Sequence, residues 1–211
     1  MKIIAPKVEP MHPIDGAVIL SRIEAAGRVC YKSESKITDG SAAAFVRRII
    51  KSGHEAVLEH CNISLKFVCD RGVSHEIVRH RLASYCLEST RYCNYSKGDF
   101  GGEITVIKPL YLIPDTAAYN VWEDACKASE AAYFKLLDWG CSAQEARAVL
   151  PNSLKTEVVM TTNLREWRHF FRLRCSPAAH PQMREVATQA LALLHEAVPG
   201  VFDDIAAEVF K

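Results

Sequence analysis

The sequence of 211 residues lacks a charge imbalance, because 26 Lys and Arg residues are set against 25 Asp and Glu residues. A net charge of +1 gives no overall attraction to nucleic acid or to a membrane surface, so any anion binding has to be local. No apolar run approaches the length of a membrane span, and residues 1–6 lack the apolar core of a signal peptide. We therefore expect a cytoplasmic protein with no nucleic-acid partner and no membrane partner.

Metal-binding spacings are also lacking. The eight cysteines are scattered and form no Cys-x-x-Cys pair, so they predict small buried side chains in a reducing compartment rather than a zinc or dithiol site. Two pairs of histidines are partly similar to a zinc-binding motif, His54 with His60 and His75 with His80. In each pair the first His is followed directly by Glu. Their histidines are six and five residues apart, whereas a helical zinc site of the His-Glu-x-x-His type needs four. We expect no metal.

The chain has no internal repeat, low-complexity tract or linker, and its 49% hydrophobic content can fill a sizeable core. We expect one domain over residues 1–211. Apolar periodicity and capping signals predict helices and strands in mixed order. The predicted strands are 2–5, 63–68, 104–107 and 155–162, and the predicted helices are 15–31, 41–52, 71–81, 115–138, 142–150, 164–173, 180–198 and 201–210.

Two helical faces carry specific predictions. In helix 115–138 the recurring apolar positions predict a core face made of Ala118, Val121, Trp122, Ala125, Ala128, Ala132 and Leu136. In helix 164–173, Arg165, Arg168 and Arg172 follow one another at spacings of three and four. This basic stripe is expected to face solvent or another subunit.

The densest mixture of cations and hydroxyls lies between residues 74 and 96. Arg79, His80, Arg81 and Arg91 lie within thirteen positions, and the hydroxyls of Ser89 and Thr90 lie between them. Guanidinium groups bind phosphate bidentately and stack on flat rings, so the set suits a planar phosphorylated ligand. A simpler interpretation is a solvated helix face, on which Glu76 pairs with Arg79 and His80.

The spacing Arg79-His80-Arg81, seven residues, Ser89, one residue, Arg91 resembles the signature of the flavin-dependent thymidylate synthases. The resemblance extends from Arg28 to Arg174 and does not depend on this stretch alone. It includes the His-Glu-x-x-x-Glu-His loop at 54–60, the Ala-Arg-x-x-Leu-Pro segment at 146–151, and Asn163 followed by His-Phe-Phe-x-Leu-Arg at 169–174.

The resemblance implies an enzyme that makes dTMP from dUMP without an enzyme nucleophile. The one-carbon group would come from 5,10-methylenetetrahydrofolate, and the reducing equivalents from NADPH through FAD. It also implies the α/β (α+β) fold of the thymidylate synthase-complementing proteins, with a mixed, mainly antiparallel central sheet flanked by helices. The family is a homotetramer whose active sites lie at subunit interfaces.

Carried over position by position, the resemblance implies that Arg174 and Ser89 are catalytic. Arg174 at a uracil carbonyl would stabilise the negative charge that develops when the base is activated. The residues implied to bind dUMP are Glu76, Arg79, Ser89, Thr90, Arg91, Arg147 and Arg174. Those implied to bind FAD are Cys30, His54, Arg79, His80, Arg81, Leu87, Asn163 and His169.

Several positions depart from the commoner family residue, namely Cys30, Ala56, Glu76, Cys86, Leu87 and His169. Leu87 matters most, because it removes a hydrogen-bonding side chain that the family has near the flavin. Cys86 is not expected to be a nucleophile, since no neighbouring base would lower its thiol pKa. Two other classes remain open: a nucleotide- or RNA-binding module that uses the arginines, and a flavin-binding relative without methylation activity.

Overall fold

The computed structural model describes residues 1–98 and 101–211, which form two compact units. The first unit consists of Met1–Lys7, Phe67–Arg79 and Cys86–Val158, and the second of Val8–Lys66, His80–Tyr85 and Val159–Lys211. Each unit therefore combines segments that are far apart in the sequence. A single domain over residues 1–211 stays a prediction.

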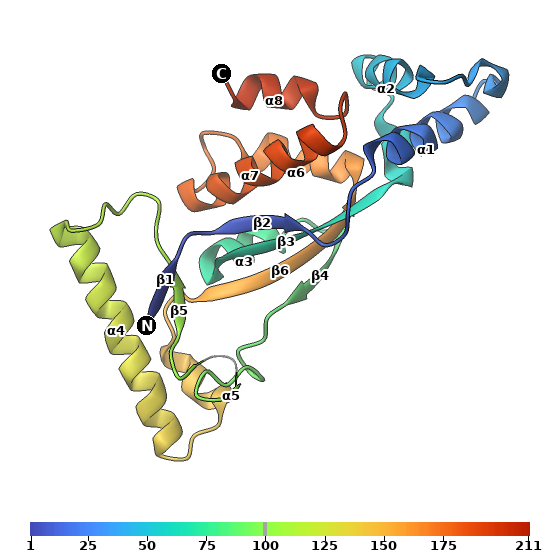
Figure 1. Ribbon diagram of the computed structural model, residues 1–211. Helices are drawn as coiled ribbons and strands as arrows, with labels where there is room; N and C mark the ends of the chain where they lie inside the picture. Colours follow the sequence, from blue (N-terminus) through green and yellow to red (C-terminus); the bar gives the residue numbers. More distant parts are fainter. Residues whose placement is uncertain (99–100) are drawn as a thin grey trace. The chain divides into compact units, whose positions relative to one another are not determined.

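The strands form a mixed, mainly antiparallel arrangement, as the family resemblance implies (Figure 1). In the four-stranded sheet the order is β2-β3-β6-β4. Strand β3 runs antiparallel to β6, because the Leu164 N–H donates to the Cys61 carbonyl while Ser64 contacts Thr161. The strands β1 and β5 pair in parallel, with Ile3 opposite Val106. The strand bounds are β1 (Lys2–Ile4), β2 (Lys7–Pro10), β3 (Asn62–Asp70), β4 (Ala83–Leu87), β5 (Thr105–Ile107) and β6 (Lys155–Asn163).

The helices follow the predicted positions with one correction. The helix after Asp70 ends at Ile77, so Arg79, His80 and Arg81 lie beyond it rather than on a helix face. The helix bounds are α1 (Gly16–Val29), α2 (Ser41–Lys51), α3 (Arg71–Ile77), α4 (Ala117–Asp138), α5 (Ala143–Ala146), α6 (Leu164–Arg174), α7 (Pro181–Ala197) and α8 (Asp203–Val209). Short 3-10 helices are η1 (Glu34–Lys36), η2 (Glu55–His60) and η4 (Arg147–Val149).

Helix α4 supplies much of the core of the first unit, but not with the predicted face. Cys126 and Tyr133 are buried against Tyr95, Ile104 and Val106. Of the predicted core positions, the side chains of 118, 121, 125 and 128 are exposed, and only those of 122, 132 and 136 are partly buried. Tyr133 packs with its ring centre 5.7 Å from that of Tyr95, and a buried aromatic ring contributes more apolar area than an alanine does.

Helix α6 is the centre of the second unit. Its side chains Trp167, Phe170 and Phe171 are fully buried, and Phe171 meets Phe202 edge to face at 5.5 Å. Figure 1 shows α6 and α7 side by side in this unit, with α8 next to them. The Trp167 indole N–H donates to the carbonyl of Ile63 in β3 at 3.2 Å. The helix is therefore fixed in position by both packing and a buried hydrogen bond.

The basic stripe predicted on α6 is wrong for one member. Arg168 is fully buried, while Arg165 and Arg172 are exposed. The Arg168 guanidinium donates to Glu55 at 3.0 Å, to both carboxylate oxygens of Asp204, and to the Val201 carbonyl. Burial alone would raise the pKa of Asp204, but the hydrogen bonds and charge of Arg168 lower it overall.

The cysteine prediction is confirmed for half of the set, since Cys61, Cys69, Cys126 and Cys175 are buried. Burial raises the pKa of the Cys175 thiol to about 11 and also raises that of Cys61. Cys30 and Cys86 are exposed instead. In residues 1–98 and 101–211, none of the helices has both the length and the apolar character needed to cross a membrane.

Replacing Arg168 with Ala should lower the free energy of unfolding by about 3 kcal/mol, because it removes the buried cation that Glu55 and Asp204 share and leaves only the exposed Arg172 beside them. Urea unfolding followed by tryptophan fluorescence measures the change. The matched control is Arg165→Ala on the same helix, whose exposed pair with Glu59 should contribute less than about 1 kcal/mol. Equal losses in the two variants would contradict this assignment.

Candidate functional site

The first part of the candidate site is built around the two ends of α6. Asn163 is the N-cap of the helix, and its side chain accepts a hydrogen bond from the Glu166 backbone N–H at 2.9 Å. This cap satisfies one of the otherwise unpaired N–H groups of the first turn. Glu166 lies in that first turn, where the helix dipole favours a negative charge, and Arg174 is the last helical residue.

His80 approaches this helix from the segment between α3 and β4. Its backbone carbonyl accepts a hydrogen bond from the Tyr85 hydroxyl at 2.6 Å. Two residues further on, the Leu82 carbonyl accepts one from Thr162 at 2.6 Å. The imidazole packs against Phe170 with the ring centres 4.9 Å apart. Because both backbone and ring are held, the imidazole has a fixed orientation.

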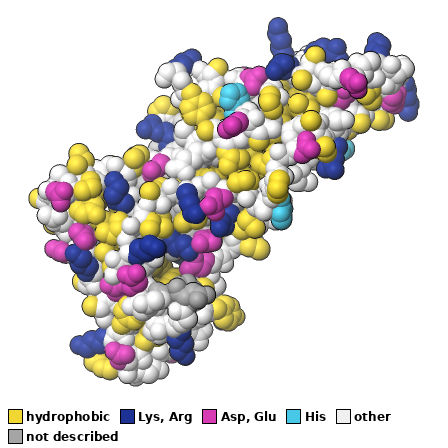
Figure 2. Space-filling model, viewed as in Figure 1, with side chains coloured by type: hydrophobic (Ala, Val, Ile, Leu, Met, Phe, Trp, Pro, Cys, Tyr) yellow, Lys and Arg dark blue, Asp and Glu magenta, His cyan; other side chains and the backbone are white. Residues whose placement is uncertain are grey.

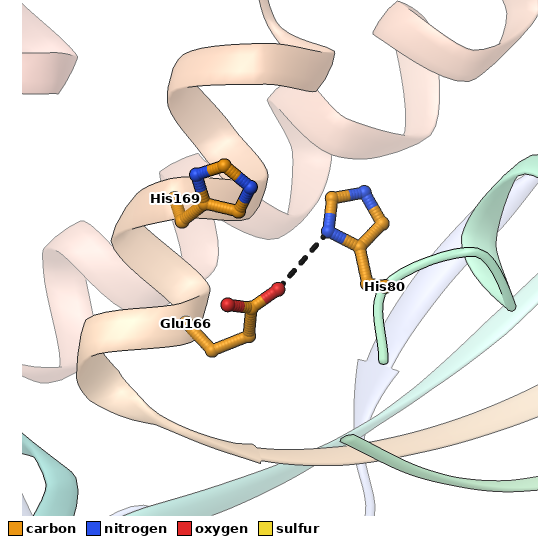
Figure 3. Close-up of side chains that lie close together, drawn as sticks. All are labelled: His80, Glu166 and His169. Atoms are coloured by element: carbon orange, nitrogen blue, oxygen red, sulfur yellow. Dashed lines mark hydrogen bonds and ion pairs between the residues drawn. The ribbon is translucent and has the colours of Figure 1, made fainter. Parts of the chain in front are cut away.

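The two ring nitrogens of His80 join the two ends of α6. Nδ1 lies 3.1 Å from a Glu166 carboxylate oxygen, as the dashed line in Figure 3 marks, and Nε2 accepts a hydrogen bond from Arg174 Nε at 3.0 Å. A guanidinium nitrogen can only donate, so Nε2 has no proton, and Nδ1–H donates to Glu166. The geometry thus selects the neutral tautomer that is protonated on Nδ1.

The electrostatics favour the same neutral ring. Burial is the largest cause that lowers the pKa of His80, and the positive charge of Arg174 lowers it further. The hydrogen bond and charge of Glu166 act in the opposite direction without reversing the shift. Burial, with the charge of Glu166, also raises the pKa of the neighbouring Tyr85 hydroxyl to about 12. His80 therefore accepts from Arg174 at neutral pH.

His80, Glu166 and His169 also form a set of possible metal ligands, with one ligand atom of each within 4.8 Å of the others. Figure 3 shows Glu166 and His169 on the helix and His80 on the facing segment. This donor set does not suit a cation, because the Arg174 guanidinium is hydrogen-bonded to the same imidazole. The arrangement is better suited to holding an organic ligand with electronegative oxygens near Arg174.

The second part of the candidate site lies in the first unit. The Arg147 guanidinium donates to the Thr90 hydroxyl at 3.2 Å, and both residues line a cavity of about 350 Å³ with Arg71 and His75. Thr90 lies in a tight turn that begins at Ser89, whose carbonyl accepts from the N–H groups of residues 92 and 93. Hydroxyls and guanidinium groups together are typical of a phosphate site.

A larger cavity of about 720 Å³ lies in the second unit between α1, α2 and η2. Cys30 and His54 line it, as do Lys36, Arg48 and Phe45. Phe45 contacts Gly27 so closely that an added Cβ would lie 2.6 Å from its ring, and the Arg28 guanidinium lies 4.7 Å above the same ring. The cavity therefore combines a flat apolar wall with cations.

The structure brings some of the predicted site residues together within a unit and leaves others apart. In the second unit the predicted residues lie on or against α6. Asn163 caps its start, His169 and Arg174 are part of it, and His80 contacts it from the segment after α3. In the first unit Ser89, Thr90, Arg91 and Arg147 share one region, while Glu76 lies on α3 and Leu87 ends β4. The side chains of Arg79, Arg81, Arg91 and Arg147 are exposed.

Glu166 was not predicted as a member of the site, although Glu166, Phe170 and Arg174 are spaced four and four residues apart. Residues at this spacing lie on one face of a helix. That spacing was the available signal in the sequence. The contact of Glu166 with His80, from a distant segment, shows that this face belongs to the candidate site.

Comparisons with known proteins identify the family of this chain. The family model described as Thymidylate synthase complementing protein matches residues 19–200. The flavin-dependent thymidylate synthase of Mycolicibacterium gilvum is 37% identical, over 94% of this chain and 84% of the relative. That of Geobacter sulfurreducens is 35% identical, over 85% and 78%.

Among solved structures, the UMP/dUMP methylase PolB of Streptomyces cacaoi, bound with 5-Br dUMP, has a TM-score of 0.77 at 23% identity. The match covers 99% of this chain and 97% of that chain, and it shows a shared fold. The fold class is thus that of a thymidylate synthase-complementing protein. The chain belongs to the flavin-dependent thymidylate synthase family.

The neutral state of His80 can be tested directly by titration. Its imidazole should titrate below the ordinary value of 6.5, with Nδ1 protonated and Nε2 unprotonated at pH 7. Nuclear magnetic resonance of ¹⁵N-histidine-labelled protein, assigned with His80→Gln, measures both properties. In Glu166→Gln the pKa should fall further, because the carboxylate charge that raises it is gone. A His80 pKa above 6.5 would contradict the hydrogen-bond assignment.

Proposed function

We propose that this chain catalyses the reductive methylation of dUMP to dTMP with no enzyme nucleophile. Its carbon donor would be 5,10-methylenetetrahydrofolate, and its reductant NADPH, acting through FAD. Family membership supports the reaction, since relatives matched over most of the chain are flavin-dependent thymidylate synthases. The observation that carries the proposal is Arg174, whose guanidinium is oriented by a neutral His80 at 3.0 Å.

In this proposal Arg174 binds a carbonyl oxygen of the uracil ring. A fixed guanidinium stabilises the negative charge that develops when the base is activated at C5, and its orientation costs nothing during the reaction. Ser89 is the second proposed catalytic residue, and its hydroxyl accepts from the Arg91 N–H at 3.3 Å. The protein's contribution is then mainly position and charge.

The phosphate of dUMP is proposed to bind the cations and hydroxyls of the first unit. Arg147 and Thr90 are already in contact at 3.2 Å, and a dianion would place its oxygens against both. Ser89 and Arg91 lie in the same turn, and Arg79 and Glu76 complete the proposed dUMP set. Several of these arginines are exposed in the single chain, as expected where copies of the chain share a site.

FAD is proposed to bind through residues that include the lining of the 720 Å³ cavity. The group fits this lining, because Phe45, Ile49 and Val57 suit a flat ring, while Lys36 and Arg48 suit a diphosphate. Once reduced by NADPH, bound FAD would supply the hydride that reduces the transferred carbon. Cys30 and His54 line the cavity, and the other proposed contacts are Arg79, His80, Arg81, Leu87, Asn163 and His169.

A homotetramer with active sites at subunit interfaces is proposed as the working form. Large apolar side chains are exposed in the single chain, among them Val121 and Trp139 at 71% and 74%. Such side chains are common at interfaces between subunits. A cytoplasmic location stays a prediction.

The nucleic-acid alternative is not favoured by the surface. On the face drawn in Figure 2, basic and acidic side chains are interspersed over the described residues rather than gathered in a stripe. A nucleic-acid module normally presents a continuous basic surface. The flavin-binding relative without methylation activity is separated from the proposed enzyme by turnover.

A turnover assay tests the proposal. The purified chain with FAD, NADPH, methylenetetrahydrofolate and dUMP should form dTMP, and omission of FAD should stop it. Arg147→Ala should raise KM for dUMP by about tenfold or more, the effect of losing a charge-assisted hydrogen bond of about 1.5–3 kcal/mol. Arg184→Ala, an exposed arginine on α7, is the matched control. Wild-type protein that retains flavin but forms no dTMP would overturn the proposed reaction.

Flavin binding has a separate test at Cys30, which is exposed and lines the large cavity. A thiol reagent should modify Cys30 rapidly without FAD and at least severalfold more slowly with saturating FAD. Labelling rates followed by mass spectrometry measure the protection. The Cys30→Ser variant should lose the protected fraction. Equal rates at Cys30 with and without FAD would contradict this placement of the cofactor.

A further inference from the structure

Glu166 holds a carboxylate in a position that the family resemblance does not account for. Its side chain is 8% exposed, and it contacts the imidazole of His80 at 3.1 Å. Burying a carboxylate has a substantial cost unless its charge and lone pairs are satisfied. A purely structural position at this packed face would be filled as well by an apolar side chain of similar volume.

The hydrogen-bond directions make Glu166 the origin of a short chain. Its carboxylate only accepts, so it requires a proton on His80 Nδ1, which leaves Nε2 as the acceptor for Arg174 Nε. Without Glu166 the imidazole is free to carry its proton on Nε2. That tautomer would set one N–H against another at the Arg174 contact and turn the guanidinium away.

The other groups around the ring do not replace this function. His169 meets the ring edge to face at 5.8 Å, and Phe170 offers only its apolar ring. Tyr85 donates to the backbone carbonyl of His80, not to the imidazole. The titratable or charged groups that face His80 are thus Glu166, His169 and Arg174 from α6 and Tyr85 from β4. Of these four groups, Glu166 is the one hydrogen-bonded to Nδ1.

We propose that Glu166 is a positioning residue for the reaction: through the Nδ1–H tautomer of His80 it fixes the plane of the Arg174 guanidinium toward the uracil carbonyl. This inference rests on the proposed function, because it assigns to Arg174 the uracil contact named there. Glu166 itself touches neither substrate nor cofactor. Its effect on the reaction passes entirely through His80 and Arg174.

A double-mutant cycle tests the inference. Glu166→Ala should lower kcat/KM for dUMP by about 10- to 100-fold, the range expected when a catalytic group is displaced by about 1 Å. In an Arg174→Ala background the same substitution should change kcat/KM by less than about twofold, because the group it orients is absent. The dissociation constant for dUMP, measured by calorimetry, should follow the same pattern.

Three further variants separate positioning from folding. Glu166→Gln should stay within about threefold of wild type, since its amide oxygen can still accept from Nδ1–H. Glu166→Leu fills the volume without an acceptor and should behave like Glu166→Ala while keeping the wild-type melting temperature. Glu196→Gln, an exposed carboxylate on α7, is the matched control for charge.

The outcomes distinguish this inference from the proposed function. If wild type forms dTMP, but Glu166→Ala and Glu166→Leu match it or lower kcat/KM by the same factor in both backgrounds, the inference is wrong and the proposed function stands. If wild type neither binds dUMP nor forms dTMP, the proposed function fails, and the inference fails with it.

Discussion

The hydrogen-bonded chain from Glu166 through His80 to Arg174 is the constraint on which the second unit's part of the site depends. It joins the first and last turns of α6 to a segment eighty-six positions earlier in the sequence. These two hydrogen bonds require a neutral His80, and burial favours the neutral ring by lowering its pKa. A single buried imidazole therefore connects the segment after α3 to both ends of α6 and orients the guanidinium that is proposed to bind substrate.

Much of the fold could be predicted from local signals. The caps at Asp15 and Asn163 and the capping box at Ser142 are visible in the sequence and present in the structure. Strand β3 buries Ile63, Leu65 and Phe67 in strict alternation, as the pattern indicates. These features depend on residues within a few positions of one another, so a single sequence is enough to reveal them.

The errors occurred where distant contacts decide the structure. No Gly or Pro lies between residues 73 and 82, so nothing local marks the end of α3 at Ile77. In α4 the predicted core face consists largely of alanines, whereas the buried face carries Tyr133 and Cys126. Only contacts with distant segments determine which of the two faces is buried. Arg168 looked like a surface residue because its partners Glu55 and Asp204 are remote in sequence.

The candidate site shows the same division. The family resemblance identified the cations from motifs in the sequence. Two of these cations contact other predicted residues, Arg147 with Thr90 and Arg174 with His80. Glu166 could not be assigned in this way, since its function depends on which proton His80 carries. Sequence reasoning located the charged groups, whereas the hydrogen bonds that orient them required coordinates.

A crystal structure of the chain with FAD and dUMP tests the central claim most directly, because it locates the nucleotide relative to the arginines. The account predicts a uracil carbonyl oxygen at hydrogen-bond distance from Arg174, with Arg174 Nε still on His80 Nε2, and the phosphate on Arg147 and Thr90 of one copy of the chain. A nucleotide bound elsewhere, or an Arg174 guanidinium turned away from both the uracil and His80, would contradict it.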